Sequence, residues 1–472
     1  MFIFVSKKLL FFLFIATLTV ISCNDNKEPA TGDTWISGEI VNPKNDFIYI
    51  TRNKKVLDTV KLDNNNFFSY QFKDPEAGIY FFNHNEYQTV FVEPGDSILL
   101  RVNTIEFDES LSFSGKGGEK NNLLMRFFLL NEKEAPLLAR YYQLPPAEFE
   151  TKVDSLKKKW EKIYNGFLAK YDPSETFKEI AQSNIDYIYY MRKELYTAAH
   201  ANKNTLNPII YPAGFYAYRD KIDMGNELLR TTYPYYRFLN FYLDNLAHEK
   251  REAKTHFNRL SFAHNYAKLR VIDSVITNDS LKNDLLKYNV RRYLLNAKNA
   301  ENEEKIIALF EETSTNTQHI KRMKKLAEAT MQLTPNHSLP NLELVTTNNT
   351  LVQLKEVIKN PTVFYFWSVK SARHNKTIHL KVAELKSKFP EYDYIGINTD
   401  TNFKKWLNMV KKQDYDLSHE YQFEDIGQAE KKLVLTSVNK ALIVDKNGKI
   451  LEGNTNLLST EIEEQLLGYI NK

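Results

Sequence analysis

Cysteine is almost absent from this chain of 472 residues, which holds a single one, Cys23. A lone cysteine excludes an intrachain disulfide, a cysteine-ligated metal site and a thiol pair that exchanges disulfides. A strong charge of one sign is also lacking, because 63 Lys and Arg face 59 Asp and Glu, a formal net charge of +4. Since the basic residues form no compact patch in the sequence, we expect no nucleic-acid partner.

Ligand side chains at a diagnostic spacing are missing too. His374 and His379 lie close together in the sequence. Their spacing of five residues points them to different faces of a helix, which does not suit two ligands of one metal ion. No further His or carboxylate completes a ligand set around them. The sequence therefore predicts no metal site, and no pattern in it indicates a cofactor.

A long apolar run stands only at the N-terminus. Lys7 and Lys8 are followed by the apolar residues 9–21, and Ser22 precedes Cys23. The run is too short for a membrane-spanning helix and fits a secretory signal. The residues before Cys23 resemble a bacterial lipobox, which implies cleavage before Cys23 and a lipid on its thiol. An ordinary signal peptide with a chance cysteine is the alternative. A lipid at this position would anchor the protein to a membrane.

The spacing of apolar residues changes along the chain, and these changes predict the domain boundaries. Residues 1–22 are the predicted lipoprotein signal peptide, and residues 23–33 are a polar tether. Residues 34–118 alternate apolar and polar side chains in short runs, which predicts a small antiparallel, β-sandwich-like domain. Pro94 and Gly95 suit the two central positions of a type II turn. The predicted strands are residues 35–41, 47–50, 56–60, 67–72, 79–82, 89–92 and 97–102.

Residues 119–333 change to a helical period and predict an all-α middle region. Ser174, directly after Pro173, is a predicted N-cap. Residues 207–218, with two prolines and a glycine, read as an irregular connection. The predicted helical stretches include residues 153–167, 177–191, 235–246, 256–276, 280–295 and 303–331.

This middle region is rich in aromatic residues, as in residues 187–190 and 233–238. We interpret these rings as core packing, because large aromatic side chains dominate protein interiors. Stacking on a bound sugar or peptide is the alternative interpretation.

Residues 334–472 predict an α/β domain in the order strand, helix, strand, helix, hairpin, helix. Its central strand ends in the stretch PTVFYFWSVKSARH, residues 361–374. A helix is expected to begin near Ser371, after a short polar turn. The other predicted elements are a strand at 342–345, a helical turn at 354–358, a strand at 394–398, a helix at 401–413, a hairpin at 440–453 and a helix at 461–470.

The segments LPNLEL (residues 339–344), VFYFW (363–367) and IVDKNGKI (443–450) resemble the TlpA/ResA group of thioredoxin-like proteins. The order of signal, β domain, helical insert and C-terminal domain is similar to that of a family of Gram-negative envelope lipoproteins. EPGDS (93–97) and SFSG (112–115) fit that family as well. The resemblance implies a thioredoxin-like fold from about residue 333 onward. It also implies a lipid-anchored location in the cell envelope, at the outer membrane, on either its periplasmic or its surface face.

The residues that perform thiol-disulfide exchange in that family are replaced in this chain. Trp367 matches its first tryptophan, and Lys370 stands where a second would be. Ser371 and His374 occupy the two cysteine positions of the CxxC motif, and Asn439 occupies the position of the cis-proline. A serine hydroxyl neither attacks a disulfide nor resolves a mixed disulfide. The sequence therefore predicts a domain without thiol-disulfide exchange.

Ser371 and His374 could still serve other chemistry, because a spacing of three residues lets two side chains meet on a helix. Asp400 or Asp445 would then be a remote orienting group for the histidine. We prefer the simpler interpretation that Ser371 caps the helix and His374 is a surface residue. Under it, the chain has no catalytic residue.

The sequence thus predicts a multidomain α+β protein with a small β domain, an all-α middle and a C-terminal thioredoxin-like α/β domain. Its leading functional interpretation is a lipid-anchored envelope protein whose redox-inactive thioredoxin-like domain serves binding or assembly. Its partners would be the membrane, through a lipid on Cys23, and an envelope protein or peptide. Two alternatives stay open: a non-redox enzyme, and a glycan- or peptide-binding carrier that uses the helical insert.

Overall fold

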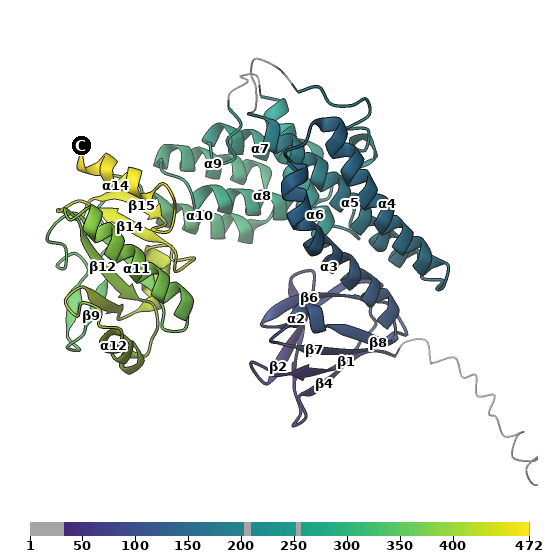
Figure 1. The fold of residues 1–472 in the computed structure, drawn as a ribbon, viewed down its shortest axis with the longest axis horizontal. Coiled ribbons are helices and arrows are strands. Elements are labelled where there is room, and N and C mark those ends of the chain that lie inside the picture. The colour runs from purple at the N-terminus through teal and green to yellow at the C-terminus, as the bar shows by residue number, and fades with distance from the viewer. Residues whose placement is uncertain (1–32, 203–208, 252–255, 472) are drawn as a thin grey trace, which may run out of the picture. The chain divides into compact units, whose positions relative to one another are not determined.

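A computed structural model describes residues 33–202, 209–251 and 256–471. The predicted signal peptide, Cys23 and the tether up to residue 32 lie outside the described residues. The chain forms two compact units. The N-terminal unit takes the chain up to Tyr189 together with Thr231–Tyr236, and the C-terminal unit takes Tyr190–Arg230 and the chain from Arg237 onward. Strands come first, helices follow and an α/β part ends the chain, which confirms the predicted multidomain α+β class (Figure 1).

Strands β1 to β8 of the N-terminal unit form two four-stranded sheets, in the orders β4-β1-β7-β8 and β3-β2-β5-β6. Alternate side chains of both sheets, among them Ile36, Phe82 and Leu100, meet in one apolar core. β1 and β7 are parallel, and the other neighbours are antiparallel. The strands are β1 Thr34–Val41, β2 Phe47–Arg52, β3 Lys55–Lys61, β4 Phe67–Phe72, β5 Gly78–His84, β6 Glu86–Val92, β7 Ser97–Asn103 and β8 Ser112–Lys116.

The predicted strands are all present, and β8 is an additional one that the sequence did not indicate. The predicted turn at Pro94 and Gly95 is confirmed. Gly95 has a φ of 81°, and the N–H of Asp96 donates to the carbonyl of Glu93 at 3.0 Å. Glycine suits the third position of such a turn because a Cβ there would be strained.

One short helix lies between β7 and β8, the other helices follow the two sheets, and α5 and α6 contribute residues to both units. They are α2 Phe107–Ser110, α3 Gly118–Tyr141, α4 Pro146–Leu168, α5 Glu175–His200, α6 Tyr233–Glu249, α7 Phe262–Val275, α8 Asp279–Leu294, α9 Ala300–Thr313 and α10 Thr317–Met331, with a 3₁₀ turn at Arg219–Lys221. Ser174 caps α5 as predicted, because its Oγ accepts the N–H of Phe177 at 3.2 Å. No helix in the described part of the chain is long and apolar enough to cross a membrane.

The sequence prediction was wrong in detail at two places in the helices. Residues 303–331 are two helices rather than one, because Asn316 caps α10 by accepting the N–H of His319 at 2.9 Å. The side-chain oxygen of Asn283 also accepts the N–H of Thr315 at 3.0 Å, which holds the break between α9 and α10. The helix expected from residue 256 begins only at Phe262, where Ser261 supplies its cap.

A seven-stranded sheet forms the α/β part of the C-terminal unit, in the order β10-β9-β13-β12-β11-β14-β15. All six residues of the central strand β11 are buried, because apolar clusters pack on both faces of the sheet. Besides β11 Thr362–Trp367, the elements are β9 Glu343–Thr346, β10 Leu351–Gln353, α11 Ala372–Lys388, β12 Asp393–Asn398, α12 Phe403–Lys412, β13 Glu420–Phe423, α13 Ile426–Lys432, β14 Ala441–Val444, β15 Ile450–Thr455 and α14 Ile462–Ile470. β10, β13 and α13 are absent from the sequence prediction.

Within the C-terminal unit, the ends of α8 and α10 pack on the sheet. Leu295 and Leu326 contact the cluster that contains Leu333 on one sheet face. The Nζ of Lys298 lies 2.5 Å from Oε2 of the buried Glu452. Gly453 approaches this junction so closely that a Cβ there would lie 1.8 Å from the carbonyl oxygen of Leu333. The α/β part is therefore packed against helices rather than tethered to them.

Candidate functional site

The corner between β11 and α11 is the place where the sequence puts the two substituted cysteine positions. Asp400 holds the turn in this corner. It accepts the hydroxyl of Ser368 at 2.8 Å and the N–H of Val369 at 2.6 Å. Asp445 accepts two N–H groups of the β14–β15 turn, those of Asn447 and Lys449, both at 2.8 Å. Both carboxylates considered as remote orienting groups are thus used in local turns.

Ser371 and His374 line the same open depression of about 550 Å³, together with Thr377 and Leu458 among others. The structure gives no hydrogen bond between them. Ser371 stands at the N-cap position of α11, but its hydroxyl makes no capping hydrogen bond; its backbone carbonyl accepts the N–H of Asn375 at 2.8 Å. The predicted side-chain cap is therefore wrong in detail, because the backbone alone begins this helix.

His374 is half-buried rather than on the surface, which corrects the sequence interpretation. Both of its ring nitrogens are buried without a hydrogen-bond partner among the described residues. Burial lowers the pKa of His374, and the nearby His379 lowers it further. A general base needs contact with the group it deprotonates, so the geometry does not make Ser371 and His374 a nucleophile–base pair.

A buried polar network lies beneath this corner, around Glu420 of β13. Its carboxylate accepts hydrogen bonds from the Tyr365 hydroxyl at 2.7 Å and from Nε1 of Trp367 at 2.8 Å. Nε2 of His379 lies 3.1 Å from the same carboxylate. The His379 ring stacks on Tyr415, with centroids 3.6 Å apart. Burial is also the main reason that the pKa of Tyr365 is raised.

The members of this network are hydrogen-bonded to one another in the interior of the domain. Glu420 is 3% exposed in its side chain, and a Cβ on Gly396 would lie 2.3 Å from its Oε1. Sequence reasoning missed Glu420 because β13 is only four residues long and was not predicted. The signal available in the sequence was the single carboxylate at the start of EYQF.

Asn439 lies in a turn before β14, where its N–H donates to the Ser437 hydroxyl at 3.1 Å. The described residues contain no cis peptide bond. The next residue, Lys440, is buried and donates to the carbonyl of Leu433 at 2.7 Å. Burial lowers the pKa of Lys440 to about 8, against the opposing charge of Glu452. The side chains of Lys440 and Glu452 line a cavity of about 240 Å³ at the junction of helices and sheet.

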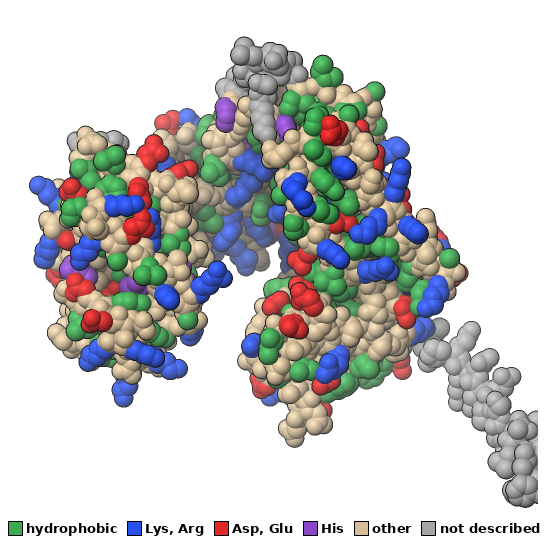
Figure 2. Space-filling model, viewed as in Figure 1, with side chains coloured by type: hydrophobic (Ala, Val, Ile, Leu, Met, Phe, Trp, Pro, Cys, Tyr) green, Lys and Arg blue, Asp and Glu red, His purple; other side chains and the backbone are tan. Residues whose placement is uncertain are grey.

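Other chemistry is sparse in the part of the chain that the structure describes. It contains no group of three His, Cys, Asp or Glu side chains that could hold a metal ion. On the visible face of the α/β part, charges of both signs are interspersed (Figure 2).

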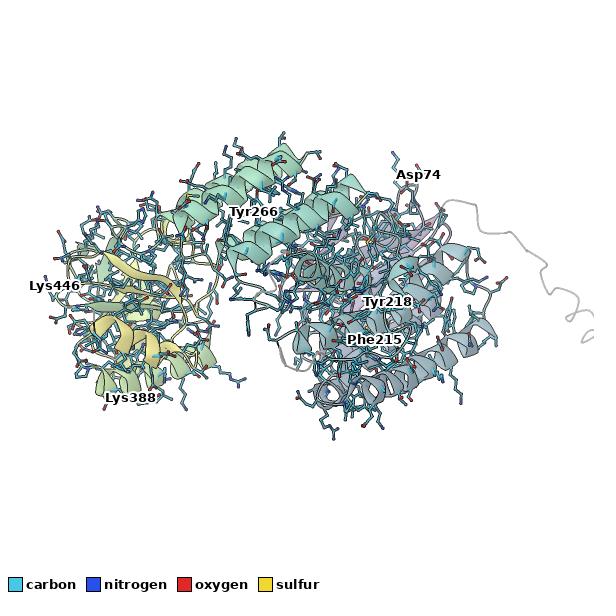
Figure 3. The ribbon with its side chains drawn as sticks, turned by 90° about the horizontal axis from the view of Figure 1, so that it is seen from above. Asp74, Phe215, Tyr218, Tyr266, Lys388 and Lys446 are labelled. Carbon is cyan, nitrogen blue, oxygen red and sulfur yellow. The ribbon has the colours of Figure 1, made fainter. Side chains whose placement is uncertain are left out.

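Of the seven aromatic side chains in residues 187–190 and 233–238, three are buried, three are half-buried and Tyr233 is exposed. Tyr187, Tyr235 and Phe238 are buried. Tyr218 and Phe215 also lie inside the helical region (Figure 3). The hydroxyl of Tyr218 donates to the buried Glu194 at 2.7 Å. The core interpretation is confirmed for Tyr187, Tyr235 and Phe238, and it is wrong for the exposed Tyr233.

An apolar pocket of about 280 Å³ in the N-terminal unit is lined by aromatic side chains that are not all buried. It lies between the β5–β6 side of one sheet and helices α3, α4 and α5, with residues 232–234 at its border. Its lining contains no Asp, Glu, Lys, Arg or His. Three of its aromatic side chains are exposed to different extents: Tyr87 (74%), Tyr233 (57%) and Phe128 (39%). A preformed apolar pocket of this kind is the usual form of a small binding site.

Comparison with known proteins identifies the C-terminal domain. Residues 359–450 match a family described as thioredoxin-like. No curated protein matches the chain. Among solved structures, a thioredoxin-like protein from Bacteroides caccae is 13% identical, covers 59% of this chain and 94% of its own, and gives a TM-score of 0.39.

Two further solved structures cover a smaller share of the chain. A thiol:disulfide interchange protein from Bacteroides sp. is 15% identical over 30% of this chain and 93% of its own, with a TM-score of 0.25. The thioredoxin domain of a thiol-disulfide oxidoreductase from Bacteroides vulgatus is 15% identical over 29% and 96%, with a TM-score of 0.23. Together with the sheet order, the family match establishes a C-terminal thioredoxin-like domain.

Proposed function

We propose that this protein is a lipid-anchored binding or assembly protein of the cell envelope, and that its thioredoxin-like domain carries no thiol chemistry. The observation that carries the proposal is the corner at residues 367–374. It keeps the strand, turn and helix of a dithiol site, but Ser371 and His374 stand at the cysteine positions. The chain holds no other cysteine than Cys23. Without a thiolate, disulfide exchange has no attacking group.

The interior of the thioredoxin-like domain supports a structural role for it. Its sheet packs against α8 and α10, and Glu420 with its partners seals the space below the corner. A domain with these contacts can hold the helices in place without performing a reaction. The lining of the open depression at Ser371 and His374 contains no Asp or Glu, so no carboxylate pairs with His374 there, as an enzyme site of another class would need.

Reductase activity tests this proposal directly. The full-length protein, extracted in detergent, is mixed with insulin and dithiothreitol, and insulin precipitation is followed by turbidity. We expect the rate of the blank without protein. A thioredoxin serves as the positive control, and the double variant Ser371→Cys with His374→Cys shows whether the corner itself can support exchange. Turnover above the blank by the unmodified protein would refute the proposal.

The lipid anchor needs a separate test, because Cys23 lies outside the described residues. Cells that express the protein are grown with an alkyne analogue of palmitate, and the purified protein is probed for the label. We expect a label in the unmodified protein and none in the Cys23→Ala variant. An unlabelled wild-type protein, with intact residues 1–22 in its mass spectrum, would show that the lipobox resemblance is accidental.

A further inference from the structure

Strand β6 lies at the edge of its sheet, next to the apolar pocket. The clean antiparallel register with β5 divides its residues into two alternating sets. Phe91 directs its N–H and carbonyl away from β5, because both are bonded to the Asn121 side chain, at 2.7 and 2.9 Å. By the same alternation, Thr89 and Tyr87 also direct their N–H and carbonyl groups away from β5. The outer edge of β6 therefore offers backbone hydrogen-bonding groups.

Asn121 shows how this edge is paired. Its amide receives one hydrogen bond from a single residue of β6 and donates one back, as the backbone of a neighbouring strand would. The adjacent Asn122 does the same to Phe113 on β8, at 3.0 and 2.7 Å. Along β6, however, Phe91 is the residue whose backbone pairs with the Asn121 side chain, and this pairing does not extend to Thr89. The N–H of Thr89 is bonded only to the side chain of its neighbour Gln88, at 2.9 Å.

Edge strands are normally protected against pairing, and strand β3 at the opposite edge of the same sheet illustrates it. It carries the exposed charges of Lys55, Asp58 and Lys61. The open stretch of β6 has no charged residue after Glu86, and Tyr87, Gln88 and Thr89 line the apolar pocket instead. Charged side chains that would protect an edge are thus missing along Tyr87–Thr89, where the pocket lies.

We propose that β6 binds an uncharged, extended peptide segment of another protein as an additional strand, with one bulky apolar side chain in the pocket. A peptide residue opposite Thr89 would exchange two backbone hydrogen bonds with it. Its side chain would lie on the same sheet face as that of Thr89, which is the pocket face, because paired residues share a face. Ile79 and Phe81 of β5 line the pocket on that face. Strand addition of this kind combines backbone affinity with side-chain specificity.

The lining explains the expected preference for an uncharged peptide. A charged side chain placed in a pocket without a counter-charge would lose its hydration without compensation. The exposed rings of Tyr87, Phe128 and Tyr233 supply contact area around the opening. This inference rests on the proposal that the protein works by binding, and it names the class of partner.

The test uses synthetic heptapeptides of Thr and Val, capped, labelled with fluorescein and varied at the central position. Binding to the full-length protein in detergent is measured by fluorescence anisotropy up to about 1 mM peptide. We expect central Phe, Leu or Trp to bind at least about tenfold more tightly than central Asp or Lys. N-methylation of single peptide amides should weaken binding at every second residue only, since alternate N–H groups face β6.

Two proline variants isolate the edge. Thr89→Pro removes an outward N–H and places a ring where the partner strand would lie, without removing a hydrogen bond to β5. Thr59→Pro is the matched control on β3, where the outward N–H is likewise bonded to the preceding side chain, Asp58, at 2.7 Å. We expect at least about a tenfold loss for Thr89→Pro and less than about twofold for Thr59→Pro.

Leu124→Trp adds a test of the pocket, because Leu124 lines it. An indole at this position should shift the preference from central Phe to a small residue. Equal losses for the two proline variants, an N-methylation pattern without a period of two, or no binding by any peptide would each overturn the inference. None of these results would alter the insulin assay, so failure of the peptide site is distinct from failure of the proposed function.

Discussion

The corner at residues 367–374 and the edge strand β6 treat their polar groups in opposite ways. At the corner, Asp400 satisfies the turn, and Glu420 satisfies Tyr365 and Trp367 from below. At β6, Asn121 satisfies one residue, and the next outward positions have no strand beside them. The corner is therefore closed in the sense that the polar groups beneath it are paired inside the fold, although an open depression lies at its surface. The outer edge of β6 is open because no strand pairs with it.

The comparison shows why a fold-level resemblance is a poor guide to the site in this chain. The resemblance points to Ser371 and His374, which share a depression but no hydrogen bond. The pocket beside β6 lies in the N-terminal unit, to which the thioredoxin-like domain does not belong. Function is therefore better argued from individual sites than from the fold, and the site that we propose lies beside β6.

The largest expected effect comes from opening the closed corner. Glu420→Ala would leave the Tyr365 hydroxyl and the Trp367 indole N–H buried without an acceptor. We expect a loss of about 3 kcal/mol in the free energy of unfolding of the thioredoxin-like domain, since each orphaned buried donor costs about 1–3 kcal/mol. Hydrogen exchange of the β11 and β12 amides and urea denaturation measure it.

Glu424→Ala is the matched control, because Glu424 follows the same strand but is exposed. It should change the free energy of unfolding by less than about 0.5 kcal/mol. If Glu420→Ala cost no more than this control, the corner would not be held from below, and the contrast with β6 would disappear.

Much of the fold could be predicted from the sequence, because local patterns determine it. Alternating runs produce strands such as β1 and β4, and the apolar run VFYFW in β11 marks the centre of the seven-stranded sheet. β8 and β13 escaped prediction for a physical reason. The sequence SFSGK of β8 is short, polar and exposed, and its place is decided by pairing with β7 rather than by its own residues.

The candidate sites were harder to predict, because their contacts are non-local. Glu420 meets Trp367 across 53 residues, and Asn121 meets Phe91 across 30. Two asparagines near the start of a helix look like ordinary polar residues of a first turn. Only the fold shows that Asn121 and Asn122 each hold one edge strand. The substituted positions Ser371, His374 and Asn439, by contrast, could be named from sequence because a motif orders them.

A smaller effect distinguishes the paired part of β6 from its open part. Asn121→Ala would leave the N–H and carbonyl of the buried Phe91 without partners. We expect it to lower the free energy of unfolding of the N-terminal unit by about 2 kcal/mol. Gln88→Ala removes the side-chain acceptor of the Thr89 N–H and a weak contact of Nε2 with the Met125 sulfur at 3.5 Å. Because the Thr89 N–H is half-buried and able to bond to water, the cost should stay below about 0.5 kcal/mol.

Urea denaturation of the Asn121→Ala and Gln88→Ala variants measures the loss in the free energy of unfolding for each. Hydrogen exchange of the β5 and β6 amides shows where the loss occurs. Equal costs would mean that Gln88 closes the edge as firmly as Asn121 does. A strand could then not add to β6 without a large penalty, and the difference between the open edge and the closed corner would be lost.

The smallest expected effect concerns His374, whose two ring nitrogens are buried at the corner without hydrogen-bond partners among the described residues. Its folded pKa is lowered by burial and by His379, so the unfolded chain binds a proton more readily than the folded chain does. The free energy of unfolding therefore falls as the pH drops below about 6.5, the usual pKa of histidine, and the contribution is fully present above it. His374→Leu should abolish this dependence and add about 1 kcal/mol, because it removes two buried nitrogens without partners.

His374→Gln separates these two consequences, since an amide does not titrate but still buries polar atoms. Thermal and urea denaturation between pH 7.5 and pH 5 should show a reduced pH dependence in both variants and a gain at neutral pH only in the leucine variant. A loss of stability in His374→Leu at neutral pH would mean that the ring has a polar role in the corner. The corner would then not be fully closed, and an active role for Ser371 and His374 would gain weight at the expense of β6.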